Sequence, residues 1–235
     1  MLLICPVRPG DSNEELRYAI RSWETNLLAP EGLELMTVGY CPSWLTPDIH
    51  VEGNRFASVP LAVFDNIMRG SDQAIGLGYG DEHVAYMNDD FFCLDPMPGL
   101  VPVKRDISLA QHRALFPSGS TQWWPLSLDL TASWLAEEGF PHPWSFEVHR
   151  PLSAPPSAML RALMRWKGGM EGPIPQWRTV YGTLERVQAH PVADVKLGGR
   201  VTGYGSPWIS TSDQSWRRYA LDIQKRFQKP SRWEN

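Results

Sequence analysis

The stretch Leu2-Leu-Ile-Cys-Pro-Val7 determines how the fold begins, because it is an apolar run that ends at Arg8-Pro9-Gly10. A short apolar run stopped by proline and glycine predicts a buried strand and a tight turn. Apolar residues then recur at helical spacing at Leu16, Ile20, Trp23 and Leu27. Ser12 and Glu15 have the spacing of a capping box at the start of that helix. The sequence therefore opens with a predicted strand, turn and helix.

The same alternation continues through the first 95 residues. Residues 36–40 and 49–51 are predicted strands, and a helix is expected to open at Ser58, with Leu61, Phe64, Ile67 and Met68 on one face. Four glycines predict a flexible connection over residues 70–81, followed by a strand at residues 83–87. This order predicts an α/β fold with a mostly parallel sheet flanked by helices. Ligands of such sheets bind outside the carboxyl ends of the strands.

The pattern becomes less regular beyond Pro96. Residues 96–156 are rich in proline and tryptophan and contain one predicted helix, at residues 128–138. Two more helices are expected, at residues 155–166 with Ser153 as the cap and at residues 216–227. We expect one domain over residues 1–235, with an α/β half at residues 1–95 and an irregular half at residues 96–235.

Composition excludes several classes of protein. A chain with 43% hydrophobic and 20% charged residues can bury a core, so it is not expected to be disordered. No apolar run approaches the roughly 18 residues of a membrane span, and no signal peptide pattern opens the chain, so no membrane partner is expected. Three separated cysteines fit neither a disulfide framework nor a paired metal motif. They predict buried thiols in a reducing, cytoplasmic setting.

The net charge of −4 is unevenly distributed. Residues 216–235 hold six basic and two acidic residues, whereas residues 1–215 hold 16 basic and 24 acidic ones. Aromatic residues interleave with the basic ones in this tail, at Trp216, Tyr219, Phe227 and Trp233. Such a segment can contact nucleic acid, but its apolar stripe favours a packed helix with a solvated basic face.

The strongest chemical signal is Asn88-Asp89-Asp90 at the end of the strand at residues 83–87. Two carboxylates beside a buried strand are costly to desolvate unless a cation or hydrogen-bond donors compensate them. Mg²⁺ commonly binds one or two carboxylates together with phosphate oxygens of a substrate. The alternative is an acidic turn whose side chains cap the next element.

Four other polar residues are candidates. Arg17 and Arg21 lie early in a helix that follows a strand, where an anion is favoured, but for this helix taken alone a solvated edge is the more common explanation. His149 can act as a general base if a carboxylate such as Glu147 orients it, but a lone histidine is more often structural. Arg178 lies in a polar stretch between aromatic residues. Most of the 11 tryptophans are expected to pack in the core.

Several of these segments occur in the order of a known family. The segments are Asn13-Glu-Glu-Leu-Arg-Tyr-Ala-Ile-Arg-Ser22, Pro42-Ser-Trp-Leu45, Val84-Ala-Tyr-Met-Asn-Asp-Asp-Phe-Phe92 and Glu147-Val-His-Arg-Pro151. They resemble the motifs of the Stealth proteins, which include capsular polysaccharide phosphotransferases and the catalytic core of lysosomal GlcNAc-phosphotransferase. Residues 7–10, 177–182 and 210–213 are also similar to short, phage-encoded proteins described as glycosyltransferases.

The resemblance implies a transferase that uses a nucleotide sugar on a GT-A-like fold. It implies a nucleotide-binding first half and an acceptor-binding, catalytic second half. A divalent metal, Mg²⁺ or Mn²⁺, is implied at Asp89 and Asp90. Catalytic roles are implied for His149, Asp90 and Arg178. Donor binding is expected from Arg8, Asn13, Arg17, Arg21 and Asn88.

Two chemistries follow from these similarities. The first is transfer of a sugar to a hydroxyl acceptor, which is a virion protein, a modified DNA or a glycan, in the host cytoplasm if the protein is phage-encoded. The second is Stealth-like transfer of a sugar-1-phosphate to a glycan. Arg8 and Pro9 stand where the Stealth opening has an aspartate, which favours the first. A module that binds sugar or nucleotide without turnover is the remaining alternative.

Overall fold

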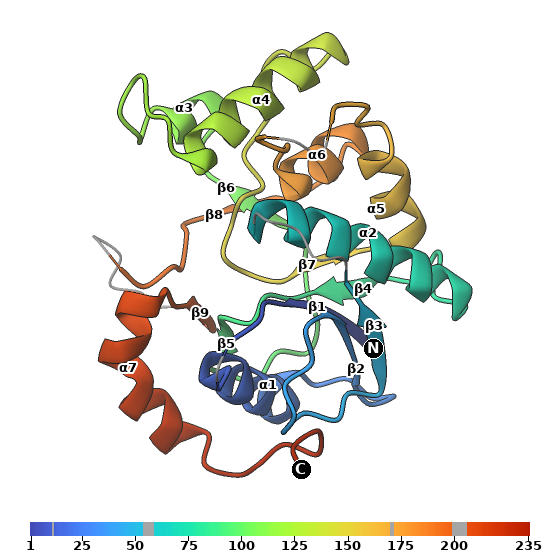
Figure 1. Cartoon of the computed structure of the whole chain (residues 1–235), viewed down its shortest axis with the longest axis vertical. Coiled ribbons are helices and arrows are strands. Elements are labelled where there is room, and N and C mark those ends of the chain that lie inside the picture. The colour runs from blue at the N-terminus through green and yellow to red at the C-terminus, as the bar shows by residue number, and fades with distance from the viewer. Residues whose placement is uncertain (11, 54–58, 170–171, 199–205) are drawn as a thin grey trace.

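The computed structural model describes residues 1–10, 12–53, 59–169, 172–198 and 206–235 (Figure 1). Its strands are β1 (Leu2–Val7), β2 (Glu34–Gly39), β3 (Ile49–Glu52), β4 (Val84–Tyr86), β5 (Phe91–Cys93), β6 (Val103–Arg105), β7 (Leu152–Ala154), β8 (His190–Val192) and β9 (Trp208–Ser210). Its helices are α1 (Glu14–Asn26), α2 (Val59–Gly76), α3 (Leu109–Arg113), α4 (Trp123–Glu137), α5 (Pro156–Leu163), α6 (Trp177–Leu184) and α7 (Asp213–Arg226).

The central sheet has the strand order β3-β2-β1-β4-β7. Its first four strands are parallel, and β7 is antiparallel to β4. The prediction of an α/β fold with a mostly parallel sheet is therefore confirmed. The sheet takes β7 from the second half of the chain, and β9 pairs with β5, so the two halves are interleaved.

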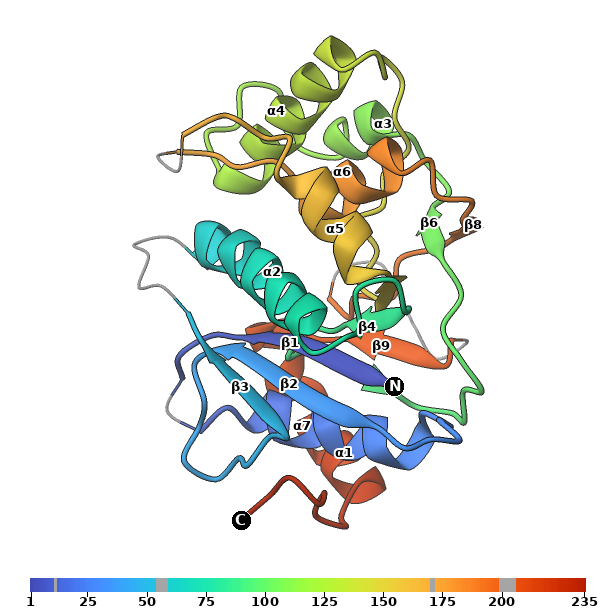
Figure 2. The same ribbon diagram turned by 90° about the vertical axis from the view of Figure 1, so that its right-hand side faces the viewer.

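Helices cover both faces of the sheet (Figure 2). Leu3, Cys5 and Val7 of β1 pack on one face with residues of α1 and α7. Leu2 and Ile4 alternate with them and pack on the other face with residues of α2, α5 and α6. Because both faces are buried, the β1 segment is apolar along its whole length, as is typical of parallel sheets.

Two expectations about the first half are wrong. Asn13 is the N-cap of α1, with a left-handed backbone (φ 48°) and no capping hydrogen bond, so Ser12 and Glu15 form no capping box. The glycines at 70 and 76 lie within α2, because residues 70–76 continue the helix instead of forming a connection. Gly70 is buried, and glycine there allows α2 to approach the sheet. Ser58, the expected cap of this helix, lies outside the described residues.

Replacing Gly70 by alanine is expected to lower the free energy of unfolding by about 1–3 kcal/mol, because it overpacks this contact. A Cβ at this position would lie 2.7 Å from Cγ2 of Ile4 and 3.1 Å from Cγ2 of Val38. Urea unfolding measures the change. Gly76→Ala, at the C-terminal end of the same helix, is the control because its Cβ would meet no atom within 4 Å. Equal stability of the two variants would contradict this account of the packing.

The second half contains more helix than the sequence predicts. Helix α4 begins at Trp123 rather than at residue 128, and α3 and α6 were not predicted. Helix α5 ends at Leu163, and its N-cap is Pro155, because Ser153 lies in β7. The expected stripe of α7 is present: Trp216 stacks on Phe92 with ring centroids 5.8 Å apart. The basic residues Arg217 and Arg218 are exposed, which supports the packed helix.

The structure also bears on the cysteines and on membrane-spanning helices. The thiols of Cys5, Cys41 and Cys93 are free. Among the described residues, no helix combines the length and the apolar character required to cross a membrane.

Candidate functional site

A cavity of about 1320 Å³ lies at the carboxyl ends of the parallel strands. The sheet contributes Arg8 after β1, Gly39 and Tyr40 at the end of β2, and residues 88–90 after β4. The opposite wall comes from α2, from the first turn of α4 and from residues 174–178. The cavity therefore occupies the position at which parallel α/β sheets bind ligands.

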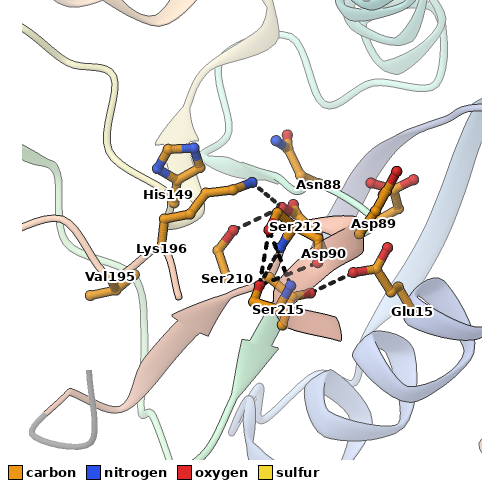
Figure 3. A network of polar contacts seen from close by, with 12 residues as sticks. Glu15, Asn88, Asp89, Asp90, His149, Val195, Lys196, Ser210, Ser212 and Ser215 are labelled. Carbon is orange, nitrogen blue, oxygen red and sulfur yellow. Dashed lines mark hydrogen bonds and ion pairs between the residues drawn. The ribbon is translucent and has the colours of Figure 1, made fainter. Parts of the chain in front are cut away.

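Asp90 is buried and lines this cavity (Figure 3). Its Oδ2 accepts hydrogen bonds from Nζ of Lys196 and from Oγ of Ser210, each at 2.8 Å. Its Oδ1 is buried and has no hydrogen-bond partner. The carboxylate is thus compensated on one oxygen only, and the buried Oδ1 is left without a partner.

Asp89 is adjacent to Asp90 and also lines the cavity. Its Oδ2 lies 3.3 Å from Nε of Arg8. Burial, followed by the negative charge of Asp90, raises the pKa of the Asp89 carboxyl to about 7, although Arg8 opposes the shift. A cation bound here would displace the proton from Asp89, since it would favour the ionised form.

His149 lies in the same cavity, and its Nδ1 is 2.9 Å from both carboxylate oxygens of Asp194. The sequence-based expectation that Glu147 orients this histidine is wrong. Oε1 of Glu147 instead accepts from the backbone N–H and the hydroxyl of Thr179, at 3.0 and 2.9 Å. Glu147 therefore fixes the first turn of α6, and Asp194 is the carboxylate that holds the imidazole.

Arg178 and Asn88 were predicted to belong to one site, and in the structure their side chains are in contact. Nη2 of Arg178 lies 3.3 Å from Oδ1 of Asn88, and Nη1 donates to the carbonyl of Arg150 at 2.8 Å. Burial lowers the pKa of Arg178 to about 10, with Glu147 opposing the shift. The guanidinium is still charged at neutral pH, so a permanent cation lies beside the residues that follow β4.

Arg8 supplies a second cation at the end of β1. It contacts three carboxylates, because Nη2 lies 3.3 Å from Oε2 of Glu15 and 3.0 Å from Oδ1 of Asp213, in addition to the contact with Asp89. Its side chain is about half exposed toward the cavity. An anionic ligand would therefore find Arg8 accessible.

Arg17, Arg21 and Asn13 do not line the cavity, contrary to their expected roles in donor binding. Arg21 forms a bidentate pair with Glu234, at 2.6 and 2.7 Å, and Arg17 lies over the ring of Trp44 and 3.5 Å from Glu234. These arginines secure the C-terminal segment on α1. Asn13 donates to the carbonyl of Arg8 at 3.0 Å, so it shapes the turn that precedes α1.

Lys196 and Asp194 are site residues that the sequence analysis missed. Both lie in the segment Asp194-Val-Lys-Leu197, and Lys196 lines the cavity. The segment is not part of any helix or strand, and neither residue belongs to a recognisable motif. The one signal in the sequence is the alternation of charged and apolar residues, which is typical of an extended segment. Four residues are too few for this pattern to predict one.

Part of the far wall of the cavity is apolar. It is formed by α2 and α4 and by residues before α6: Pro60, Val63, Trp123, Trp124, Ile174 and Pro175. Trp123 is 49% exposed and packs edge-on against Trp124, with ring centroids 5.1 Å apart. A large exposed indole on a cavity wall provides a surface for stacking or apolar contact with a ligand.

The residues at this site fit a divalent cation that is bound partly by the protein and partly by a substrate. Asp90 has an oxygen with no partner, and Asp89 has a carboxyl that a nearby positive charge would ionise. Among the residues that the structure describes, no group of three His, Cys, Asp or Glu side chains surrounds a common point. Two carboxylates completed by phosphate oxygens are a usual arrangement for Mg²⁺.

Comparisons with known proteins assign no family. No family model matches the chain, and no curated protein matches it.

Proposed function

We propose that this protein is a glycosyltransferase that moves a sugar from a nucleotide-sugar donor to a hydroxyl acceptor. The observation that supports this most is the cavity at the carboxyl ends of β1 and β4, which combines paired aspartates, accessible cations and a carboxylate-bound histidine. The strand order β3-β2-β1-β4 with an antiparallel neighbour is compatible with a GT-A-like fold. The motif resemblance to Stealth and phage-encoded transferases points the same way.

The charges suggest where the donor binds. A nucleotide sugar carries a diphosphate, and Arg8, Arg178 and Lys196 are the cations that line the cavity among the described residues. Their positive charge would stabilise the diphosphate as negative charge develops on it. Arg8 and Lys196 each form an ion pair with an aspartate. When the donor binds, its phosphate oxygens would contact the same two cations.

His149 is the proposed base for the acceptor. Its ring takes the proton of the acceptor hydroxyl as that oxygen forms a bond to the anomeric carbon. The bond between the anomeric carbon and the phosphate oxygen breaks, its electron pair stays on the leaving nucleoside diphosphate, and the proton remains on His149. A divalent metal held by Asp89 and Asp90 would neutralise charge on the diphosphate.

The acceptor is expected to contact the apolar residues of α2 and α4, because Arg8, Asp90 and Lys196 lie on the other side of the cavity. Trp123→Ala should therefore raise the acceptor KM by about tenfold, which corresponds to about 1.4 kcal/mol of lost contact. Donor hydrolysis in the absence of acceptor should not change. Leu126→Ala, in the same helix and outside the cavity, serves as the control. An unchanged acceptor KM in Trp123→Ala would place the acceptor elsewhere.

Analysis of the products tests the proposal directly. The protein is incubated with UDP-, GDP- and dTDP-linked sugars and with Mg²⁺ or Mn²⁺. Virion proteins, DNA with hydroxyl-bearing modified bases, or glycans are added as acceptors. Release of a nucleoside diphosphate supports glycosyl transfer. A nucleoside monophosphate would show transfer of sugar-1-phosphate. Donor binding without either product would show a binding module.

A further inference from the structure

The segment Asp194-Val-Lys-Leu197 is built like a strand along the edge of the site. Val195 and Leu197 are 3% and 1% exposed and belong to the core between the sheet and α1. Ser210 donates to the carbonyl of Val195 at 3.2 Å, and its own carbonyl accepts from Leu197 at 2.6 Å. Because side chains alternate along an extended segment, Asp194 and Lys196 face away from this core. Lys196 lines the cavity, and Asp194 reaches His149, which also lines it.

Each of the two charged residues holds one group of the proposed active site. Lys196 binds Asp90 (Figure 3). Asp194 binds His149. Asp194 is fixed by further donors: its Oδ1 accepts from the backbone N–H groups of His149 (3.1 Å) and Val195 (2.9 Å), and its Oδ2 accepts from Arg105 (2.9 Å). The His149 bonds and the Arg105 charge hold the pKa of Asp194 far below its usual range against the effect of burial.

An ionised carboxylate only accepts hydrogen bonds, so the His149 nitrogen beside it must be the donor. The Nδ1 of His149 therefore carries a proton. In the neutral ring, Nε2 is then the nitrogen without one, and a general base requires that lone pair. The contacts of Asp194 thus determine both the tautomer and the orientation of His149.

We infer that Asp194 is a positioning residue that fixes His149 in the Nδ1-protonated tautomer and so prepares Nε2 to accept a proton. This inference deepens the proposed function, since the use of that proton acceptor rests on the transferase reaction. Asp194 itself does not contact the acceptor, and its role is exerted through the imidazole.

Asp194→Asn tests the inference because it changes one acceptor into a donor. The two backbone N–H groups require an acceptor at the position of Oδ1, so the amide NH₂ group takes the position of Oδ2, 2.9 Å from Nδ1, and Arg105 loses its acceptor there. Nδ1 then lies between one acceptor and one donor, so its protonated form loses the advantage that it has beside two acceptors. The tautomer of His149 is read from long-range ¹H–¹⁵N spectra of protein labelled at histidine, without substrate. His149→Ala identifies the signals. We expect Nδ1 protonation in the wild type and a shift toward Nε2 protonation in the variant.

The kinetic readout is hydrolysis of the nucleotide sugar that the wild-type protein turns over. The wrong tautomer is expected to lower kcat by about 10²–10⁴-fold with little change in donor KM. Arg105→Gln removes the other charged partner of Asp194 and should keep the wild-type tautomer. Asp129→Asn, which has an arginine partner on the surface, should change neither readout.

The two proposals fail in different ways. Wild-type His149 protonated at Nε2, or Asp194→Asn protein with an unchanged tautomer and kcat, would overturn the role of Asp194. Loss of the tautomer in Arg105→Gln as well would show that Asp194 serves only the local structure, and it would also overturn that role. A wild-type protein with the expected tautomer that converts no donor would instead overturn the proposed function.

Discussion

His149→Ala is expected to lower donor turnover by about 10²–10⁴-fold, which is the usual contribution of a general base. The reason is that His149 is the histidine held by a carboxylate in the cavity that contains Asp89 and Asp90. Folding should be largely retained. Asp194 would keep Arg105 and two backbone N–H groups as donors, so no buried charge would lose all its partners. The measurement is kcat at saturating donor, with thermal unfolding to confirm the fold.

His83→Ala is the matched control for this prediction. His83 also makes one side-chain hydrogen bond, at 3.1 Å to Ser153, but it does not line the cavity. Its loss should leave turnover within about twofold of the wild type, as expected for a residue remote from the chemistry. Equal kcat values for His149→Ala and the wild type would show that another group takes the acceptor proton.

The sequence was sufficient to predict the sheet because burial on both faces produces a recognisable pattern. The apolar run of β1 and the polar residues after β4 predicted a parallel sheet and the edge at which the cavity lies. Helix α2 was predicted too short because glycine weakens helices in general. At Gly70 the close approach of Ile4 and Val38 outweighs that preference, and this contact is long-range.

Part of the candidate site could also be predicted from the strand pattern. Residues 88–90 follow a strand, so their position at the sheet edge was predictable, whereas the meeting of His149 and Arg178 with them was inferred from motif order. Arg17 and Arg21 were expected to bind the donor, but the geometry of α1 keeps them away from the cavity. The cavity is lined by Arg8 in the turn before α1, and α1 directs its arginines toward the C-terminal segment. Asp194 enters the site through strand-like pairing with residues near 210, which no local pattern encodes.

Asp90→Asn is expected to reduce metal-dependent turnover by about 10²–10⁴-fold, since several kcal/mol of charge stabilisation would be lost. The substitution keeps the shape of the side chain and removes the charge beside the unpartnered Oδ1. Lys196 is about one-third exposed, so leaving it without a counter-charge should cost only about 1 kcal/mol of stability. The measurement is an activation curve: protein treated with EDTA is titrated with Mg²⁺ or Mn²⁺, and the variant should need at least about tenfold more metal, equivalent to about 1.4 kcal/mol.

Ser210→Ala separates the charge of Asp90 from its hydrogen bonds. The hydroxyl of Ser210 donates to Oδ2 of Asp90 at 2.8 Å, so its removal loosens the same carboxylate without changing its charge. A hydrogen bond to a charged group contributes about 1.5–3 kcal/mol to stability. Lys196 still holds the same Oδ2, so turnover should fall much less than in Asp90→Asn, and the metal requirement should stay close to that of the wild type. A wild-type enzyme that retains full activity in EDTA would remove the metal from the mechanism. If instead both variants showed the wild-type activation curve, Asp90 would not be a metal ligand, and its role would be limited to holding Lys196 beside the donor.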